Sequence, residues 1–208
     1  MIGLIDYGMG NLHSVAKALE KVGGQVELVK DADDLAKYER IVLPGVGAFR
    51  DCMAALRDSG LDQAIKETVA KGTPMLGICL GMQAMLTRSY EFGIHAGLNM
   101  IEGEVKPFPE SHVDRGFKIP HMGWNDIVLP QSESHVVLKG LNQQQVYYVH
   151  SYYCAPRNPD HLLGACSYGD FPFASVIGRN NILGMQFHPE KSQKAGLTLL
   201  KGFVEWQP

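Results

Sequence analysis

The chain has 208 residues, of which 45% are hydrophobic and 20% are charged, and its formal net charge is −3. This length suits a single α/β domain over residues 1–208 with a sizeable core. The net negative charge and the lack of any run of three Lys or Arg argue against nucleic-acid binding. No apolar stretch is long enough to span a bilayer and no basic leader precedes Asp6, so we expect a cytoplasmic protein with no membrane role.

Residues 1–78 alternate between short apolar runs and segments of helical periodicity. Strands are predicted at 1–5, 25–30, 41–43 and 74–78, and helices at 12–22, 33–37 and 61–69. Asn11 is placed to cap the first helix. Alternation of strand and helix predicts a parallel sheet with helices on both faces.

The second half changes to short β-rich runs separated by turn residues. The predicted strands are 101–105, 125–129, 146–153 and 174–177, and we expect antiparallel pairing among them. A last helix is predicted from about Ser192 to Trp206. Its inward side chains are expected to be Leu197, Leu200, Phe203 and Val204.

Cys79 lies between Gly77 and Gly81, directly after an apolar run. Strand, sharp turn and helix in this order make a nucleophile elbow, in which the turn lifts the side chain clear of the sheet. The helix predicted from Leu80 to Arg88 would point free N–H groups at the sulfur and favour thiolate over thiol. Cys79 is therefore a candidate nucleophile, with a buried inert cysteine as the alternative.

His188 is the candidate base for this cysteine. Pro189 disfavours the α region for His188, and in an extended segment His188 and Glu190 face the same side. The imidazole can then take the thiol proton while the carboxylate supports the imidazolium. His188 alone would more often be a buried core histidine, but the three residues together favour catalysis.

Other candidate sites are weak. Cys52, Cys154 and Cys166 have no CxxC spacing and are interpreted as small buried residues without disulfides. The histidines show no HxxxH pattern, so we expect no metal site, and we expect no cofactor. A glycine pair at Gly8 and Gly10 lacks the third glycine of a dinucleotide site and is interpreted as a tight turn.

Cys79 in its elbow and the later segment His188-Pro189-Glu190 together resemble the class I (triad) glutamine amidotransferase family. The resemblance covers essentially the whole chain and implies a flavodoxin-like sheet and glutaminase activity. Four segments resemble one branch of the family, the glutaminase subunits of the histidine pathway. They are Ile5–Asn11, Leu43–Phe49, Pro120–Asn125 and Tyr147–Tyr153.

This resemblance implies roles for residues around the triad. The loop of Gly45, Val46 and Gly47 and the N–H of Leu80 would form an oxyanion hole. Gln83, Ser151 and Tyr152 would contact the substrate glutamine. From the residues alone, the loop could equally be a simple turn and the other three ordinary helix and strand positions.

The resemblance also implies a heterodimer. Its partner would be a (β/α)8-barrel synthase subunit that receives ammonia through a channel, since we expect 208 residues to be taken up by the glutaminase. The predicted interface residues are Met122, Trp124, Asn125, Tyr147 and Lys191. A core tryptophan and a solvated lysine are the alternatives at two of these positions.

Three other functions stay open at this point. A triad glutaminase could serve anthranilate, guanylate or pyridoxal phosphate synthesis, although the 120–125 segment disfavours it. A flavodoxin-like cysteine hydrolase for other amides is disfavoured by the long spacing between Cys79 and His188. An inactive binding module is disfavoured by the intact set of Cys, His and Glu.

Overall fold

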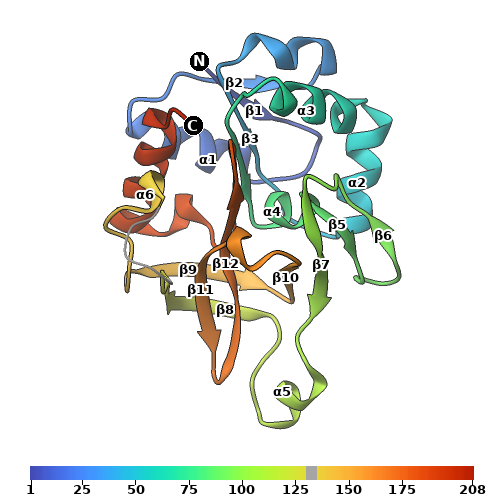
Figure 1. Cartoon of the computed structure of the whole chain (residues 1–208), viewed down its shortest axis with the longest axis vertical. Coiled ribbons are helices and arrows are strands. Elements are labelled where there is room, and N and C mark those ends of the chain that lie inside the picture. The colour runs from blue at the N-terminus through green and yellow to red at the C-terminus, as the bar shows by residue number, and fades with distance from the viewer. Residues whose placement is uncertain (130–134) are drawn as a thin grey trace.

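The computed structural model describes residues 1–129 and 135–208, and a seven-stranded sheet forms its centre (Figure 1). The strand order is β11-β12-β13-β4-β3-β1-β2. The strands are β1 (Ile2–Ile5), β2 (Val26–Val29), β3 (Arg40–Leu43), β4 (Met75–Ile78), β11 (Leu162–Tyr168), β12 (Phe171–Arg179) and β13 (Ile182–Met185). Neighbours from β13 to β2 are parallel, whereas β11, β12 and β13 pair antiparallel. The predicted α/β class with a mostly parallel sheet is confirmed.

Helices cover both faces of this sheet, as Figure 1 shows. One face carries α1 (Leu12–Lys21) and α6 (Gln193–Glu205), and the other carries α2 (Phe49–Asp58), α3 (Leu61–Ala70) and α4 (Leu80–Ala84). A short 3-10 helix, η1 (Ala32–Lys37), follows β2. Within residues 1–129 and 135–208, every helix is too short or too polar to cross a membrane.

Burial explains the apolar patterns of these elements. β1, β3, β4 and β13 are buried at every position, as expected of parallel strands covered on both faces. α1 buries Val15, Ala18 and Leu19, which recur at the spacing of an amphipathic helix. The layers therefore follow from where the sequence places its apolar side chains.

The inward face of α6 differs slightly from the prediction. Leu200 and Phe203 are fully buried as predicted, and Leu199 is buried with them. Leu197 and Val204 are only partly buried, although they pack against the core. The buried stripe is therefore rotated from the predicted one toward Leu199, which leaves Leu197 and Val204 at its margin.

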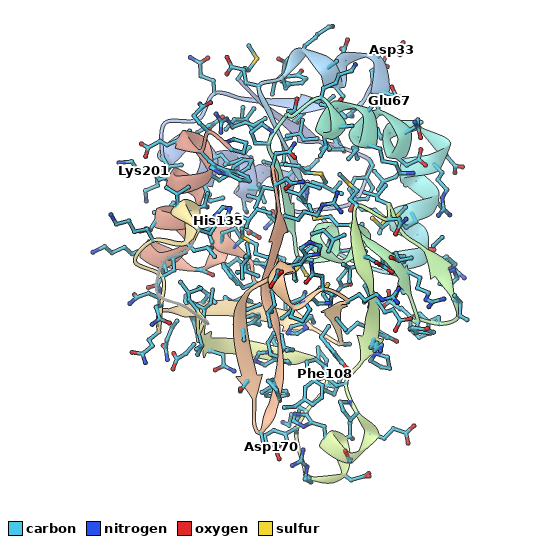
Figure 2. All side chains as sticks on the ribbon, in the orientation of Figure 1. Asp33, Glu67, Phe108, His135, Asp170 and Lys201 are labelled. Carbon is cyan, nitrogen blue, oxygen red and sulfur yellow. The ribbon has the colours of Figure 1, made fainter. Side chains whose placement is uncertain are left out.

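Two smaller sheets extend the second half of the chain. A four-stranded sheet has the order β10-β7-β5-β6, and β8 pairs antiparallel with β9. Their strands are β5 (Leu86–Ser89), β6 (His95–Ala96), β7 (Ile101–Pro107), β8 (His121–Asp126), β9 (Gln145–His150) and β10 (Tyr152–Pro156). A short helix, α5 (Glu110–Asp114), stands at the lower end of Figure 1. Phe108, labelled in Figure 2, lies between β7 and this helix and belongs to the core.

The helix predicted from Leu80 to Arg88 is wrong beyond Ala84. α4 ends there and the chain passes into β5. The carbonyls of Ala84 and Met85 accept hydrogen bonds from the N–H groups of Leu98 and Met100 instead of from a next helical turn. Long-range backbone pairing therefore overrides the helix propensity of this segment.

Three other local predictions need correction. The run 146–153 is broken at Ser151, because β9 pairs with β8 whereas β10 pairs with β7. The run 125–129 is strand only as far as Asp126, and Val128 makes an isolated bridge to Ala165. Asn11 precedes α1, but its side chain makes no capping hydrogen bond.

The sheet brings three loops together at one edge. Its register pairs Leu43 with Gly77 and Ile78 with Met185. The loops that follow β3, β4 and β13 therefore emerge side by side. This is the edge at which open α/β sheets bind ligands, beyond the carboxyl ends of parallel strands.

Gly81 fixes how closely α4 approaches β3. A Cβ at this position would lie 1.9 Å from the backbone oxygen of Leu43. We expect Gly81→Ala to push α4 off the sheet and to lower the free energy of unfolding by at least about 3 kcal/mol. Gly72→Ala is the control, since its Cβ would meet nothing within 4 Å and only its left-handed backbone costs about 1–2 kcal/mol. Chemical denaturation of both variants measures the loss in free energy of unfolding. Equal losses would contradict the role assigned to Gly81 in the close approach of α4 to β3.

Candidate active site

Cys79 occupies a strained turn between β4 and α4. Its φ is 53° and its ψ is −108°, which is a costly conformation for a residue with a Cβ. Its N–H donates to the carbonyl of Met185 at 2.8 Å, and its own carbonyl accepts the N–H of Gln83 at 3.1 Å. These two hydrogen bonds hold the turn in place. The strained backbone dihedral angles are those of Cys79 itself.

Gly77 and Gly81 serve close packing at this turn. A Cβ on Gly77 would lie 2.7 Å from the oxygen of Gly81, and one on Gly81 would clash with β3. Neither glycine is among those with positive φ. The two glycines flanking Cys79 are therefore required by the short distance between α4 and the sheet.

His188 and Glu190 meet across a turn. His188 is extended, and Pro189–Lys191 forms a 3-10 turn, η4, where an extended segment was predicted. The two side chains nevertheless pair as predicted, with Nδ1 of His188 2.8 Å from Oε1 of Glu190, and both are almost fully buried. The N–H of His188 donates to the carbonyl of Tyr147 at 2.9 Å, so β9 fixes the backbone that carries the imidazole.

The surroundings of His188 favour its protonated form. Burial alone would lower the pKa of His188, but the neighbouring Cys79 sulfur and the hydrogen-bonded Glu190 carboxylate raise it to about 10. Because Nδ1 faces Glu190, Nε2 is the ring nitrogen left for the sulfur and a substrate. Among the described residues, no hydrogen bond of good geometry occupies Nε2. His188 thus lies beside the Cys79 sulfur and is braced by the Glu190 carboxylate, which is the arrangement expected of a base for a nucleophilic thiol.

Cys79 and His188 open onto one cavity of about 350 Å³. This volume lies in the usual range of small-molecule sites. The cavity is lined by Val46, Gly47, Cys79, Leu80, Gln83, Glu91, Pro120, Val149, His150, Ser151, Tyr152 and His188. A larger surface hollow of about 550 Å³ lies on the four-stranded sheet and contains no cysteine or histidine.

The structure thus gathers most predicted substrate and oxyanion residues around one cavity. Gly45 is the exception, because it packs against the elbow, where a Cβ would sit 2.6 Å from the Tyr7 hydroxyl and 2.9 Å from Cβ of Leu80. Gly45 therefore permits the loop to pack on the elbow. Gly47 has a φ of +100°, so a glycine is favoured there by the backbone itself.

Glu91 is a cavity residue that the sequence did not suggest. It follows β5, and its Oε2 accepts the N–H of Phe49, the first residue of α2, at 2.6 Å. This bond ties the cavity wall to the helix that follows the 45–47 loop. No motif marks Glu91, and the segment before it was interpreted as helix, so local sequence carried no signal for it.

His150, which lines the cavity, forms a buried pair with His121. Nδ1 of His150 lies 2.8 Å from the Tyr152 carbonyl, and its Nε2 lies 3.1 Å from Nδ1 of His121. Because a carbonyl only accepts, His150 donates through Nδ1 and accepts from His121 through Nε2. Burial lowers the pKa of His121 to about 4 and that of His150 to about 3. Both rings are therefore neutral, with tautomers set by the Tyr152 backbone.

The predicted interface residues divide between two sides of β8. Met122 and Trp124 are 65% and 44% exposed, and the Trp124 ring lies 5.9 Å from that of Tyr147. The ammonium of Lys191 lies 5.7 Å from the centre of the Tyr147 ring. These four residues form one surface, which we call the β8–β9 face.

Asn125 lies on the other side of β8. Its amide donates to the carbonyl of Ser167 at 2.9 Å and lies 3.5 Å from Nε2 of His121. Successive residues of a strand point to opposite faces, so Asn125 cannot share the surface of Trp124. The structure therefore does not bring Asn125 to the β8–β9 face.

Metal ligation has no basis in the residues that the structure describes, because no group of three or more His, Cys, Asp or Glu side chains could hold an ion there. All four cysteines are unpaired. The chemistry available to the site is that of Cys79, His188 and Glu190 together with backbone N–H groups.

This chain is similar to known proteins over nearly its whole length. A model of the glutamine amidotransferase class-I family matches residues 3–206. The imidazole glycerol phosphate synthase subunit HisH of Wolinella succinogenes is 46% identical over 206 residues, covering 99% of both chains. The subunit of the same name from Acinetobacter baylyi is 47% identical over 207 residues, covering 99% of this chain and 98% of its own.

Solved structures support the fold. The structure of PurLQS from Thermotoga maritima has a TM-score of 0.75 at 16% identity, and the match covers 98% of this chain and 96% of the other. A crystal structure of a glutamine amidotransferase has a TM-score of 0.73 at 16% identity, and that match covers 97% of this chain and 98% of the other. The chain belongs to the class-I glutamine amidotransferase family. Within that family, its sequence groups with the HisH subunits of imidazole glycerol phosphate synthase.

The buried pair of histidines makes stability depend on pH. The folded pKa of His121 is lowered to about 4, whereas an unfolded histidine binds a proton near pH 6.5. The unfolded state therefore binds more protons between these values, and stability falls as the pH drops from about 6.5. We expect His121→Phe to reduce the loss of unfolding free energy between pH 7 and pH 5 by on the order of 1–2 kcal/mol.

Chemical denaturation at the two pH values measures this difference. His13→Gln is the control, because His13 is exposed on α1 and should leave the pH dependence unchanged. An identical acid loss in His121→Phe and the unsubstituted protein would contradict the assignment of a neutral buried imidazole.

Proposed function

We propose that this protein hydrolyses glutamine to glutamate and ammonia, as the glutaminase subunit of an imidazole glycerol phosphate synthase. The observation that carries the proposal is the Cys79 thiol in a strained elbow, sharing a cavity with a His188 imidazole that Glu190 braces at 2.8 Å. Family membership and the relatives named HisH support the same reaction.

The Cys79 thiolate attacks the side-chain carbonyl carbon of glutamine, and the carbonyl oxygen becomes an oxyanion. His188 gives the proton on Nε2 to the amide nitrogen as the C–N bond breaks and ammonia leaves. A water molecule then attacks the thioester while His188 takes its proton. The C–S bond breaks, glutamate departs, and the thiolate–imidazolium pair is restored.

Backbone N–H groups would hold the oxyanion. Leu80 is the first residue of α4, so its N–H has no partner within the helix. Val46 and Gly47 line the same cavity, and their loop packs against Leu80 at Gly45, so we assign the second donor to this loop. Loss of one such donor typically reduces kcat by about 100- to 1,000-fold.

Polar groups around the cavity suit a free amino acid. The carboxylate of Glu91 is placed to pair with the α-ammonium, and the backbone of Ser151 and Tyr152 borders the same space. Both amide protons of Gln83 are engaged, by the Tyr152 carbonyl and by Gln186 at 3.2 Å each. Gln83 therefore offers its oxygen to the substrate, as an acceptor.

We assign the acceptor of the ammonia to another chain. The relatives are named as subunits of a synthase, and we assign the same assembly here, with a (β/α)8-barrel synthase subunit as the partner. The β8–β9 face is the docking surface, because it exposes a tryptophan and a methionine that are typical of interface anchors. An enclosed route between the two subunits would keep ammonia unprotonated until it reacts.

The 45–47 loop is proposed to control when the oxyanion hole is complete. Gly47 holds a left-handed backbone, and Val46 is 43% exposed. A peptide beside a glycine can rotate at low cost, so partner binding can turn an N–H toward the cavity. Glutamine would then be hydrolysed only when the acceptor is ready.

Replacing the nucleophile tests the function. In the complex with the synthase subunit, we expect Cys79→Ala to abolish glutamine-dependent synthesis and to retain ammonia-dependent synthesis, because only the source of ammonia is lost. Product formation is measured with glutamine and, in parallel, with an ammonium salt at alkaline pH. Loss of both activities would assign Cys79 a structural role and overturn the proposal.

Replacing Trp124 tests the docking surface. We expect Trp124→Ala to weaken binding of the barrel subunit by about 30-fold or more, as for an aromatic interface anchor, and to leave the melting temperature nearly unchanged. Leu28→Ala is the matched control, since Leu28 is 49% exposed on β2, at the far edge of the sheet. Binding is measured by titration calorimetry. Equal affinities for both variants would exclude the β8–β9 face as the interface.

A further inference from the structure

Gln186 lies directly behind the nucleophile. It follows β13, its side chain is fully buried, and its Nε2 lies 3.7 Å from the Cys79 sulfur. This distance is within hydrogen-bonding range for a sulfur acceptor. The contact is set by the sheet, because β13 and β4 are parallel neighbours whose last residues, Met185 and Ile78, are paired.

The orientation of this amide is fixed by a chain of hydrogen bonds. Nε2 of Gln83 lies 3.2 Å from the Tyr152 carbonyl and 3.2 Å from Oε1 of Gln186. The Tyr152 carbonyl can only accept, so the group that faces it is the NH₂ of Gln83. The second proton of that NH₂ then requires an oxygen on Gln186. The Gln186 NH₂ is therefore the end that points at the sulfur.

A competing group lies on another side of the sulfur. The carbonyl of Val149 on β9 is 3.9 Å from the sulfur and can accept from an S–H. A carbonyl favours the neutral thiol, whereas an N–H donor favours the thiolate. The state of Cys79 therefore depends on Val149, which favours the thiol, and on Gln186 and His188, which favour the thiolate.

We propose that Gln186 is part of the catalytic apparatus, donating a side-chain hydrogen bond that holds the Cys79 sulfur as a thiolate. This inference deepens the proposed glutaminase function and rests on it. α4 has only five residues, so its dipole is weaker than that of a longer helix. The buried Gln186 amide points at the sulfur and supplies thiolate stabilisation that the short helix provides less well.

The same donor acts twice in the reaction. Before attack, it stabilises the negative sulfur. In the second half, water adds to the thioester, the C–S bond breaks, and its electron pair returns to sulfur. The Gln186 N–H stabilises that departing thiolate without transferring a proton. Its removal should therefore slow both the formation and the hydrolysis of the thioester.

Alkylation of the sulfur by iodoacetamide tests the inference without using glutamine. The rate is measured against pH for the full-length protein and for Gln186→Met, which keeps the side-chain length and removes the donor. We expect the midpoint of the pH profile to rise by about one pH unit or more, as for loss of a hydrogen bond to a charged group. Cys79→Ala gives the background from the three buried cysteines.

Ser175→Ala is the matched control. Ser175 is fully buried beside Gln186, and its hydroxyl lies 2.5 Å from that of Tyr148, so its loss removes a buried hydrogen bond away from the sulfur. The control should lower the melting temperature and leave the alkylation midpoint unchanged. An unchanged midpoint in folded Gln186→Met, or an equal shift in both variants, overturns the inference.

A second measurement uses the unsubstituted side chain, in case Gln186→Met fails to fold. In the ¹⁵N-labelled protein, the side-chain NH₂ signals of Gln186 should shift with the same midpoint as alkylation, and Cys79→Ala should abolish that shift. Signals that do not titrate overturn the inference. If the Gln186 signals titrate but the complex releases no ammonia from glutamine, only the glutaminase proposal is refuted.

Discussion

The parallel pairing of β13 with β4 places together groups that lie 107 positions apart in the chain. Cys79 follows one strand and Gln186 follows the other, with His188 two residues further on. Backbone hydrogen bonds of two buried strands therefore set the position of the sulfur relative to its donor and its base. Both strands are buried at every position, so this alignment is held by packing on both faces as well as by backbone pairing.

The strain at Cys79 depends on that alignment. A positive φ at a cysteine costs free energy, and it persists because the N–H of Cys79 is bound to Met185 and α4 is pressed against β3. The flanking glycines make the close approach possible. α4 is short, because it ends after five residues where the chain turns into β5. The electrostatic stabilisation of the sulfur accordingly comes from individual side chains.

Sequence reasoning reached the fold class and the pairing of His188 with Glu190, because buried strands and short motifs are local signals. It failed where a distant segment decides the outcome. The helix predicted to Arg88 ended early because residues 98–101 take its hydrogen bonds. Asn125, a predicted interface residue, lies on the opposite side of β8 from Trp124, where the carbonyl of Ser167 on a distant strand accepts a hydrogen bond from its amide. Glu91 and Gln186 acquire their roles only through tertiary contacts, with Phe49 in one case and with Cys79 in the other.

Strand β9 links the proposed docking surface to the reacting atoms. The carbonyl of Tyr147 accepts the N–H of His188, and the carbonyl of Val149 faces the Cys79 sulfur. The ring of Tyr147 contacts Trp124 and Lys191 on the outer face. A partner docked on the proposed β8–β9 face would contact this strand, and any shift of β9 would carry with it the carbonyls of Tyr147 and Val149. The proposed docking surface and the nucleophile are thus linked through one strand, because Tyr147 contributes its ring to the surface and Val149, two residues further on, contributes its carbonyl to the sulfur.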